Sequence, residues 1–312
     1  MKKPKITIVG AGQVGATAAH LTALKELGDI ILLDKAEGIA KGKALDLMHA
    51  APVSGYHVNI IGTADYKETK DSDVVVITAG LPRKPGMSRD DLLAANIKIV
   101  KEVTQQITKY SPNAILVIVT NPLDVMVYVA QKISNFPHNH VLGMAGTLDA
   151  ARFRAFLAME LNVPSRDIKS FVLGGHGDLM LPLIRHTEVK GKPIYELLPE
   201  QKIKELIERT QKGGAEIVKY LEIGSAFYAP ASCVVEIVDS IVNDKKEILL
   251  ASVYVDGKYN TKGVYIGVPA KIGKDGVEEV IELDLNKEEM EKFQKSVEHV
   301  KKTLEKVGGM IW

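Results

Sequence analysis

Short apolar runs alternate with helical patterns through the first half of the chain. The runs predict strands at residues 6–9, 30–33, 58–61, 74–78 and 114–119. Ala/Leu-rich or amphipathic stretches between them predict helices over residues 14–27, 38–50 and 90–110. Strands that are apolar on both faces and alternate with helices are typical of a parallel sheet covered on both sides. The first half therefore predicts an α/β domain built on such a sheet.

The rhythm changes near residue 143. The pattern then predicts a helix over residues 147–161, with Thr147 as its N-cap. It predicts strands at 181–190, 192–194, 248–255 and 264–272, and helices at 200–220, 224–242 and 287–307. Because strands and helices are grouped here rather than alternating, we expect a mixed α+β second domain. The predicted division is 1–143 and 144–312.

Composition narrows the class of protein. The 312 residues are 46% hydrophobic and 25% charged, with a net charge of +1, which argues against a broad surface for nucleic acid or membrane. No apolar run approaches the length of a membrane span, and the apolar segment before Gly10 is too short for a signal peptide. The single cysteine, Cys233, excludes an intrachain disulfide. We expect a cytoplasmic protein.

A glycine-rich motif follows the first predicted strand. Gly10-Ala11-Gly12-Gln13-Val14-Gly15 fits G-x-G-x-x-G and opens the first helix, where backbone N–H groups can hold a pyrophosphate. Asp34 closes the second strand, 19 residues after Gly15. A carboxylate there accepts hydrogen bonds from an adenosine ribose and repels a 2′-phosphate, which favours NAD over NADP. A tightly packed helix start without a ligand, or a site for FAD or S-adenosylmethionine, would use much of the same pattern.

Two further segments should lie at the carboxyl edge of the sheet. Residues 79–89 follow a predicted strand and hold Arg83 and Arg89 among glycines and prolines, as a closing loop that binds an anion would. The alternative is an exposed basic loop. Asn121 follows the most apolar strand, where its amide can bind a ligand or cap the next helix before Pro122.

The remaining candidates for catalysis are a histidine and an ion pair. Gly174-Gly175-His176-Gly177-Asp178 places an imidazole in an open turn after an apolar run, although such turns also occur without chemistry. Asp149 and Arg152 share one helical face. They form either a weak surface pair, or a site in which Asp149 orients an imidazole and Arg152 binds a carboxylate. Their spacing does not choose between these alternatives.

Together these motifs resemble the lactate/malate dehydrogenase family along nearly the whole chain. They occur in the family's order: GAGQVG, Asp34, LPRKPGMSR from Leu81, TNP from Thr120, LDAAR from Leu148 and GGHGD from Gly174. Within the family, the chain is similar to the malate dehydrogenases of the lactate-dehydrogenase-like branch. The resemblance implies an N-terminal Rossmann-type NAD-binding domain, a C-terminal substrate domain, and a homodimer or homotetramer.

The resemblance also implies roles for single residues. His176 would accept the proton of the substrate hydroxyl, Asp149 would orient the imidazole, and Arg152 would bind the C1 carboxylate. Arg89 would polarise the carbonyl oxygen, and Asn121 would hydrogen-bond the same oxygen or help to place the nicotinamide. The implied cofactor contacts are Gly10, Ala11, Gly12, Gln13, Val14, Gly15, Asp34, Asn96, Val119, Thr120 and Asn121.

Arg83 separates the candidate substrates. The lactate enzymes typically have a neutral residue at the matching position, whereas a guanidinium here calls for a second carboxylate, as in malate and oxaloacetate. Leaving that charge buried without a partner would cost about 3–5 kcal/mol. Ala226 stands where lactate enzymes usually carry a bulkier threonine, which is consistent with a larger substrate. The expected activity is the NAD-dependent interconversion of malate and oxaloacetate. A lactate or other 2-hydroxyacid dehydrogenase and a non-catalytic NAD-sensing module are the alternatives.

Overall fold

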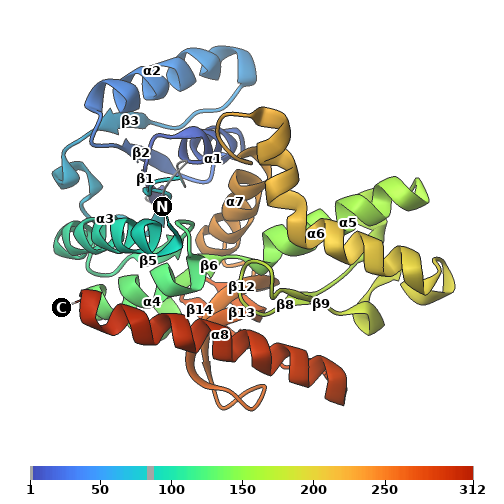
Figure 1. The fold of residues 1–312 in the computed structure, drawn as a ribbon. Coiled ribbons are helices and arrows are strands. Elements are labelled where there is room, and N and C mark those ends of the chain that lie inside the picture. The colour runs from blue at the N-terminus through green and yellow to red at the C-terminus, as the bar shows by residue number, and fades with distance from the viewer. Residues whose placement is uncertain (1–2, 83–87, 312) are drawn as a thin grey trace.

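A single sheet of nine strands forms the centre of the molecule (Figure 1). The computed structural model describes residues 3–82 and 88–311. Six strands are parallel, in the spatial order β3-β2-β1-β4-β5-β6. Their bounds are β1 Lys5–Val9, β2 Asp29–Leu33, β3 Ile60–Thr63, β4 Val74–Ile77, β5 Ile115–Ile118 and β6 Val141–Met144. This order reverses at β1 and β4, which confirms the predicted Rossmann-type parallel sheet.

Three antiparallel strands extend the same sheet beyond β6. They are β12 Glu247–Asp256, β13 Lys262–Gly273 and β14 Gly276–Val280. The α/β character of both halves is confirmed, but the last long strands of the second half continue the first half's sheet rather than forming a separate one. The expected division between residues 143 and 144 falls within β6, and it stays a prediction.

Helices cover both faces of the sheet. Along β1, Ile6 and Ile8 point to one face and Val9 to the other, as the alternation of a strand requires. The first face is covered by α1 Gln13–Leu24, α2 Glu37–Ser54 and α7 Tyr228–Val242. The second is covered by α3 Arg89–Tyr110 and α4 Leu123–Ser134. Both faces of the parallel strands are therefore buried, which explains why these strands are apolar throughout.

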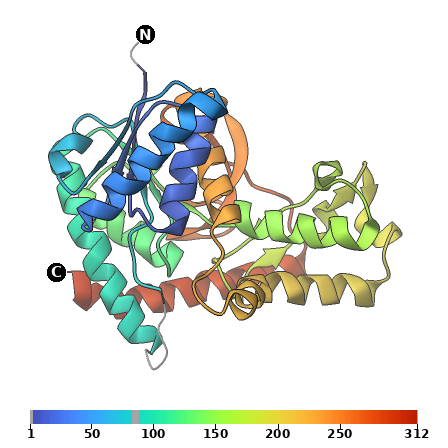
Figure 2. The ribbon, with the colours of Figure 1, turned by 90° about the horizontal axis from the view of Figure 1, so that it is seen from above.

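A smaller apolar core lies in the second half of the chain. It forms between α5 Gly146–Leu161, α6 Glu200–Leu221 and short strands. The short strands of this half are β7 Ile168–Lys169, β8 Val172–Leu173, β9 Leu181–Pro182, β10 Glu188–Val189 and β11 Lys192–Pro193, and β7, β8 and β10 contribute residues to this core. Figures 1 and 2 show α5 and α6 extending away from the sheet, on the side opposite α2 and α3. The 3₁₀ helices are Tyr66–Thr69, His138–His140, Ser165–Asp167, Ile184–His186 and Ile194–Glu196.

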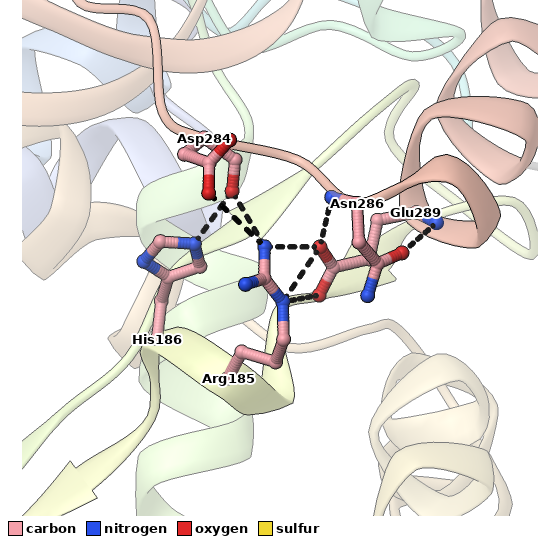
Figure 3. A network of polar contacts seen from close by, with 5 residues as sticks. All are labelled: Arg185, His186, Asp284, Asn286 and Glu289. Carbon is pink, nitrogen blue, oxygen red and sulfur yellow. Dashed lines mark hydrogen bonds and ion pairs between the residues drawn. The ribbon is translucent and has the colours of Figure 1, made fainter.

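The final helix, α8 Lys287–Ile311, runs along the molecule (Figure 2), and its apolar residues pack into the cores on both faces of the sheet. Asn286 stands before it and makes reciprocal hydrogen bonds with Glu289, each of 2.9 Å between a backbone nitrogen and a side-chain oxygen. Arg185 binds Glu289 through Nε and an NH2 group, and both Arg185 and His186 donate to the Asp284 carbonyl (Figure 3). The start of α8 is thus capped and held against the 3₁₀ turn at Ile184–His186.

Several local predictions were wrong. Thr147 is not an N-cap, because its hydroxyl donates to the Leu250 carbonyl at 2.7 Å and the helix already begins at Gly146. The predicted strand over 181–190 is interrupted by a 3₁₀ turn, and the helix predicted from residue 224 begins at Tyr228. The bounds of helix α4 were not predicted. Nine of its 12 residues are buried, and they include the polar Asp124 and Gln131, so this stretch does not look like a surface helix.

Candidate active site

The glycine-rich loop connects β1 to α1 and has the shape that its sequence predicts. Gly10 has φ +104°, and a Cβ there would lie 2.6 Å from Thr78 Oγ1. A Cβ on Gly15 would collide with the Gly10 carbonyl oxygen. By contrast, the space beside Gly12 is open, and no described side chain caps the helix that begins at Gln13. The N–H groups of the first turn of α1 can therefore approach an anionic ligand closely.

Asp34 binds this loop directly. Its carboxylate accepts hydrogen bonds from the backbone nitrogens of Ala11, at 2.8 Å, and Ala36, at 2.9 Å. Each carboxylate oxygen keeps a further lone pair for a hydroxyl donor. Lys43 was not among the predicted site residues, although its ammonium on α2 donates to the Ala11 carbonyl at 2.7 Å. The basic residue alone carried no signal, because its partner lies 32 residues earlier.

Asn96 on α3 and Thr120 after β5 both contact the backbone that follows β4. The buried Asn96 amide accepts from the Leu81 backbone nitrogen at 2.8 Å and donates to the Asn121 carbonyl at 2.7 Å. The Thr120 hydroxyl donates to the Ala79 carbonyl at 2.7 Å. Val119 is half-buried at the same edge. In this structure Asn96 and Thr120 bind the backbone that supports the loop.

Asn121 lies exposed at the carboxyl edge of the sheet. The alternative in which it caps the following helix is wrong, because α4 begins at Leu123 and Pro122 occupies the preceding position. Its side chain is therefore not committed to a helix end. This leaves the amide available at the edge where ligands bind in open α/β sheets.

His176 and Asp149 form a buried pair. His176 Nδ1 lies 2.9 Å from Asp149 Oδ2, and the two side chains are 15% and 3% exposed. A carboxylate at Nδ1 fixes the tautomer that carries its proton there and leaves Nε2 as the free base. Burial lowers the pKa of His176, but the charge and hydrogen bond of Asp149 outweigh it, so the net pKa lies above the ordinary value.

Arg152 completes this cluster. One of its terminal nitrogens lies 3.6 Å from Asp149 Oδ1, and its side chain is 15% exposed, so the two do not form a surface ion pair. Arg152 Nε is buried and has no hydrogen-bond partner among the described residues. Helix α6 packs against this side chain: a Cβ at Gly213 would lie 3.4 Å from Arg152 Cδ, and one at Gly214 would lie 3.5 Å from the guanidinium, both ordinary van der Waals contacts. A cation with unused donors beside a histidine base suits an anionic substrate.

The side chains of the two arginines predicted in the loop after β4 lie outside the described residues. Arg83 lies outside the described residues. Arg89 is the first residue of α3, and its side chain also lies outside them. The backbone that presents Arg89 is well defined locally, because Ser88 and Asp91 form a capping box at the start of α3.

Asp124, in the first turn of α4, was not among the predicted site residues either. Its carboxylate accepts from the His176 backbone nitrogen at 3.0 Å and from the Ser252 hydroxyl at 2.7 Å. An acid three residues after Asn121, at the carboxyl edge of the sheet, was the available signal. Within residues 3–82 and 88–311 no cluster of His, Cys, Asp or Glu is suited to a metal ion. No helix in that part is long and apolar enough to cross a membrane.

Comparison with known proteins gives matches over the whole chain. The family model described as "lactate/malate dehydrogenase, NAD binding domain" matches residues 4–143, and the "lactate/malate dehydrogenase, alpha/beta C-terminal domain" matches residues 146–310. The malate dehydrogenase of Heliobacterium modesticaldum is 54% identical over 99% of this chain and 100% of its own.

Solved structures agree with this match. The apo malate dehydrogenase of Picrophilus torridus has a TM-score of 0.93 and 50% identity, covering 96% of this chain and 95% of its own. A lactate dehydrogenase of Cryptosporidium parvum, solved with lactic acid and nicotinamide adenine dinucleotide, has a TM-score of 0.94 and 40% identity, with 97% of each chain covered. The fold is thus shared between malate and lactate enzymes. The chain belongs to the lactate/malate dehydrogenase family.

Proposed function

We infer that this protein is an NAD-dependent malate dehydrogenase that interconverts malate and oxaloacetate. The observation that carries this function is the buried His176–Asp149 pair, with the Arg152 guanidinium beside it. The similarity to malate dehydrogenases over nearly the whole chain agrees with it.

NAD fits the nucleotide end of this site. The open space beside Gly12, the uncapped start of α1 and the Asp34 carboxylate match a pyrophosphate followed by a ribose with free hydroxyls. We assign the contacts to residues 10–15 and Asp34, with Asn96, Val119, Thr120 and Asn121 toward the nicotinamide. When bound, NAD supplies the acceptor for the hydride that leaves C2 of malate.

The protein's own groups move the proton and hold the substrate. During malate oxidation, His176 Nε2 takes the proton of the C2 hydroxyl, and the bond between that oxygen and C2 becomes a carbonyl. Asp149 keeps the imidazole oriented and stabilises the imidazolium. Arg152 holds the C1 carboxylate by its free donors. Asn121 and Arg89 are assigned to the reacting oxygen, and Arg83 to the C4 carboxylate.

The raised pKa of His176 predicts how the rates of malate oxidation and oxaloacetate reduction change with pH. Malate oxidation requires the neutral imidazole, so its kcat/KM rises as the pH increases through the pKa of His176. Oxaloacetate reduction requires the imidazolium and falls over the same range. Because Asp149 raises that pKa, both changes should occur above the ordinary histidine range, which is centred near 6.5.

Substrate choice is the first prediction. The absorbance of NADH should decay on addition of oxaloacetate and far more slowly with pyruvate. Arg83→Gln removes the cation assigned to the second carboxylate, so kcat/KM for oxaloacetate should fall by roughly 10²-fold while pyruvate gains relative to it. No decay with either substrate would refute the dehydrogenase function. An unchanged ratio in the variant would refute the role of Arg83 alone.

Assembly and location remain proposals. We propose a homodimer or homotetramer, as the family resemblance implies. Large apolar side chains exposed on α2 and beside α6 support this, with Ile39 53%, Leu45 58%, Val53 91% and Ile223 90% exposed. Light scattering on the purified protein would give two or four times the mass of one chain. The cytoplasmic location expected from the sequence is checked by fractionation of the source cells.

A further inference from the structure

A second buried carboxylate lies behind the catalytic turn. Asp124 is 6% exposed, and both of its oxygens accept hydrogen bonds. Oδ2 accepts from the His176 backbone nitrogen at 3.0 Å, and Oδ1 lies 2.7 Å from the Ser252 hydroxyl. Two donors thus point at one carboxyl group, and hydrogen bonds of this kind are stronger to the ionised carboxylate than to the neutral carboxyl.

The turn that carries His176 is held residue by residue. The backbone of Gly174 pairs with that of Gly267 on β13, and the nitrogen of Gly175 donates to Ser296 on α8 at 2.8 Å. The nitrogen of His176 is held by Asp124 on α4. A Cβ on Gly175 would lie 3.3 Å from the Asp124 carboxylate, so the contact is close-packed. Of the three anchors, only Asp124 brings a charge.

That charge has no fixed cation beside it. No described Lys, Arg or His side-chain nitrogen lies within ion-pair distance of Asp124. The charged groups that face His176 are Asp149 and Arg152 from α5 and Asp124 from α4. Burial raises the pKa of Asp124 above its ordinary value, and the hydrogen bonds from Ser252 and the His176 backbone offset that rise only in part. An imidazolium at His176 is therefore the positive charge best placed to offset Asp124.

We propose that Asp124 is a positioning residue for the reaction: its carboxylate fixes the backbone of His176 and favours the imidazolium that forms when malate gives up its hydroxyl proton. This inference rests on the proposed function. Asp149 acts on the imidazole by direct contact, whereas Asp124 acts through the backbone and its electrostatic field. Two carboxylates from two helices thus support one base.

The deciding variant is Asp124→Asn, which keeps the size of the side chain and an acceptor oxygen for His176 but removes the charge. Loss of the charge makes the imidazolium less stable. The pH profile of kcat/KM should then move to lower pH in both directions of the reaction. For oxaloacetate reduction, the ratio of kcat/KM at pH 8.5 to that at pH 6 should fall about threefold or more relative to the unmodified enzyme. A purely structural role would lower kcat equally at every pH.

A matched control separates this effect from the loss of any buried acid. Asp239 is 5% exposed, and it pairs with Lys25 and Lys245 rather than with the turn of His176. Asp239→Asn should keep the pH profile of the unmodified enzyme. Superimposable profiles for Asp124→Asn and the unmodified enzyme would overturn the inference. An unmodified enzyme without oxaloacetate turnover would instead overturn the proposed function.

A second measurement decides the matter if Asp124→Asn does not fold. In the unmodified protein labelled with ¹⁵N-histidine, the His176 amide should resonate downfield and exchange with solvent about 10²-fold or more slowly than an unprotected amide. An exchange rate typical of an open loop would show that Asp124 does not hold this backbone, and would overturn the inference.

Discussion

At the scale of single residues, the site depends on what surrounds one imidazole. His176 Nδ1 is engaged by Asp149 at 2.9 Å, which leaves Nε2 as the group that can exchange a proton with substrate. The side chain is 15% exposed, so this base is kept largely away from bulk water. These contacts support a catalytic role better than the role of a surface histidine in a turn.

Replacement of this imidazole tests the role directly. His176→Asn removes the base but keeps a polar side chain of similar size, so kcat for malate oxidation should fall by roughly 10²–10⁴-fold. NADH should still bind with nearly unchanged affinity, because the glycine-rich loop and Asp34 lie on other elements. Turnover is followed by NADH absorbance and binding by NADH fluorescence. Loss of NADH binding together with activity would point to a structural role for His176.

At the scale of elements, one buried carboxylate joins the end of α1 to α7 and to the segment before β12. Asp239 Oδ2 lies 2.9 Å from the ammonium groups of both Lys25 and Lys245, and Oδ1 accepts from Asn243 at 2.8 Å. Burial alone would raise the pKa of Asp239, but these donors lower it to about 2. The pair with Lys25 crosses 214 residues of sequence, so it links the two halves of the chain.

The stability of this junction should depend on pH in a defined way. The pKa of Asp239 is lower in the folded than in the unfolded protein. Its contribution to the free energy of unfolding is therefore present above about pH 4 and is lost as the pH falls toward 2. Asp239→Asn should therefore lower the free energy of unfolding by about 2 kcal/mol at pH 7. Urea unfolding at pH 7 and at pH 3 measures the difference, which should shrink at the lower pH. A difference that is independent of pH would mean that the ion pairs contribute little.

The sequence predicted the elements whose signals are local. The Gly10–Gly15 loop, Asp34 and the strands of the parallel sheet follow from short patterns with direct steric or electrostatic causes. The bounds of helix α4 were not predicted, because most of its residues, including the polar Asp124 and Gln131, are buried. The partners of Asp124 lie 52 and 128 residues away, at His176 and Ser252, and no spacing along the chain indicates such contacts. The continuation of the sheet into β12 likewise depends on a pairing with β6 that only the folded chain reveals.

At the scale of the whole molecule, the cofactor site and the catalytic turn belong to one sheet. The nucleotide loop follows β1, while the turn of His176 is tied to β13 and α8. Figure 1 shows these strands in the same continuous sheet, with α8 along one side. A ligand that binds the folded glycine-rich loop therefore stabilises the whole sheet and the apolar cores on both of its faces, rather than one half of the chain.

This linkage gives the last prediction. NADH at about one hundred times its Kd should stabilise the folded protein by about 2.7 kcal/mol, and so raise Tm by several degrees in differential scanning calorimetry. NADPH at the same concentration should do much less, because its 2′-phosphate would meet the Asp34 carboxylate beside the Ala11 backbone. Asp34→Ser removes that repulsion, so the effects of the two cofactors should converge in the variant. Equal stabilisation of the unmodified protein by NADH and NADPH would mean that Asp34 does not select the cofactor, and a cation such as Lys43 on α2, which donates to the Ala11 carbonyl, would then be the group to test for contact with the 2′-phosphate.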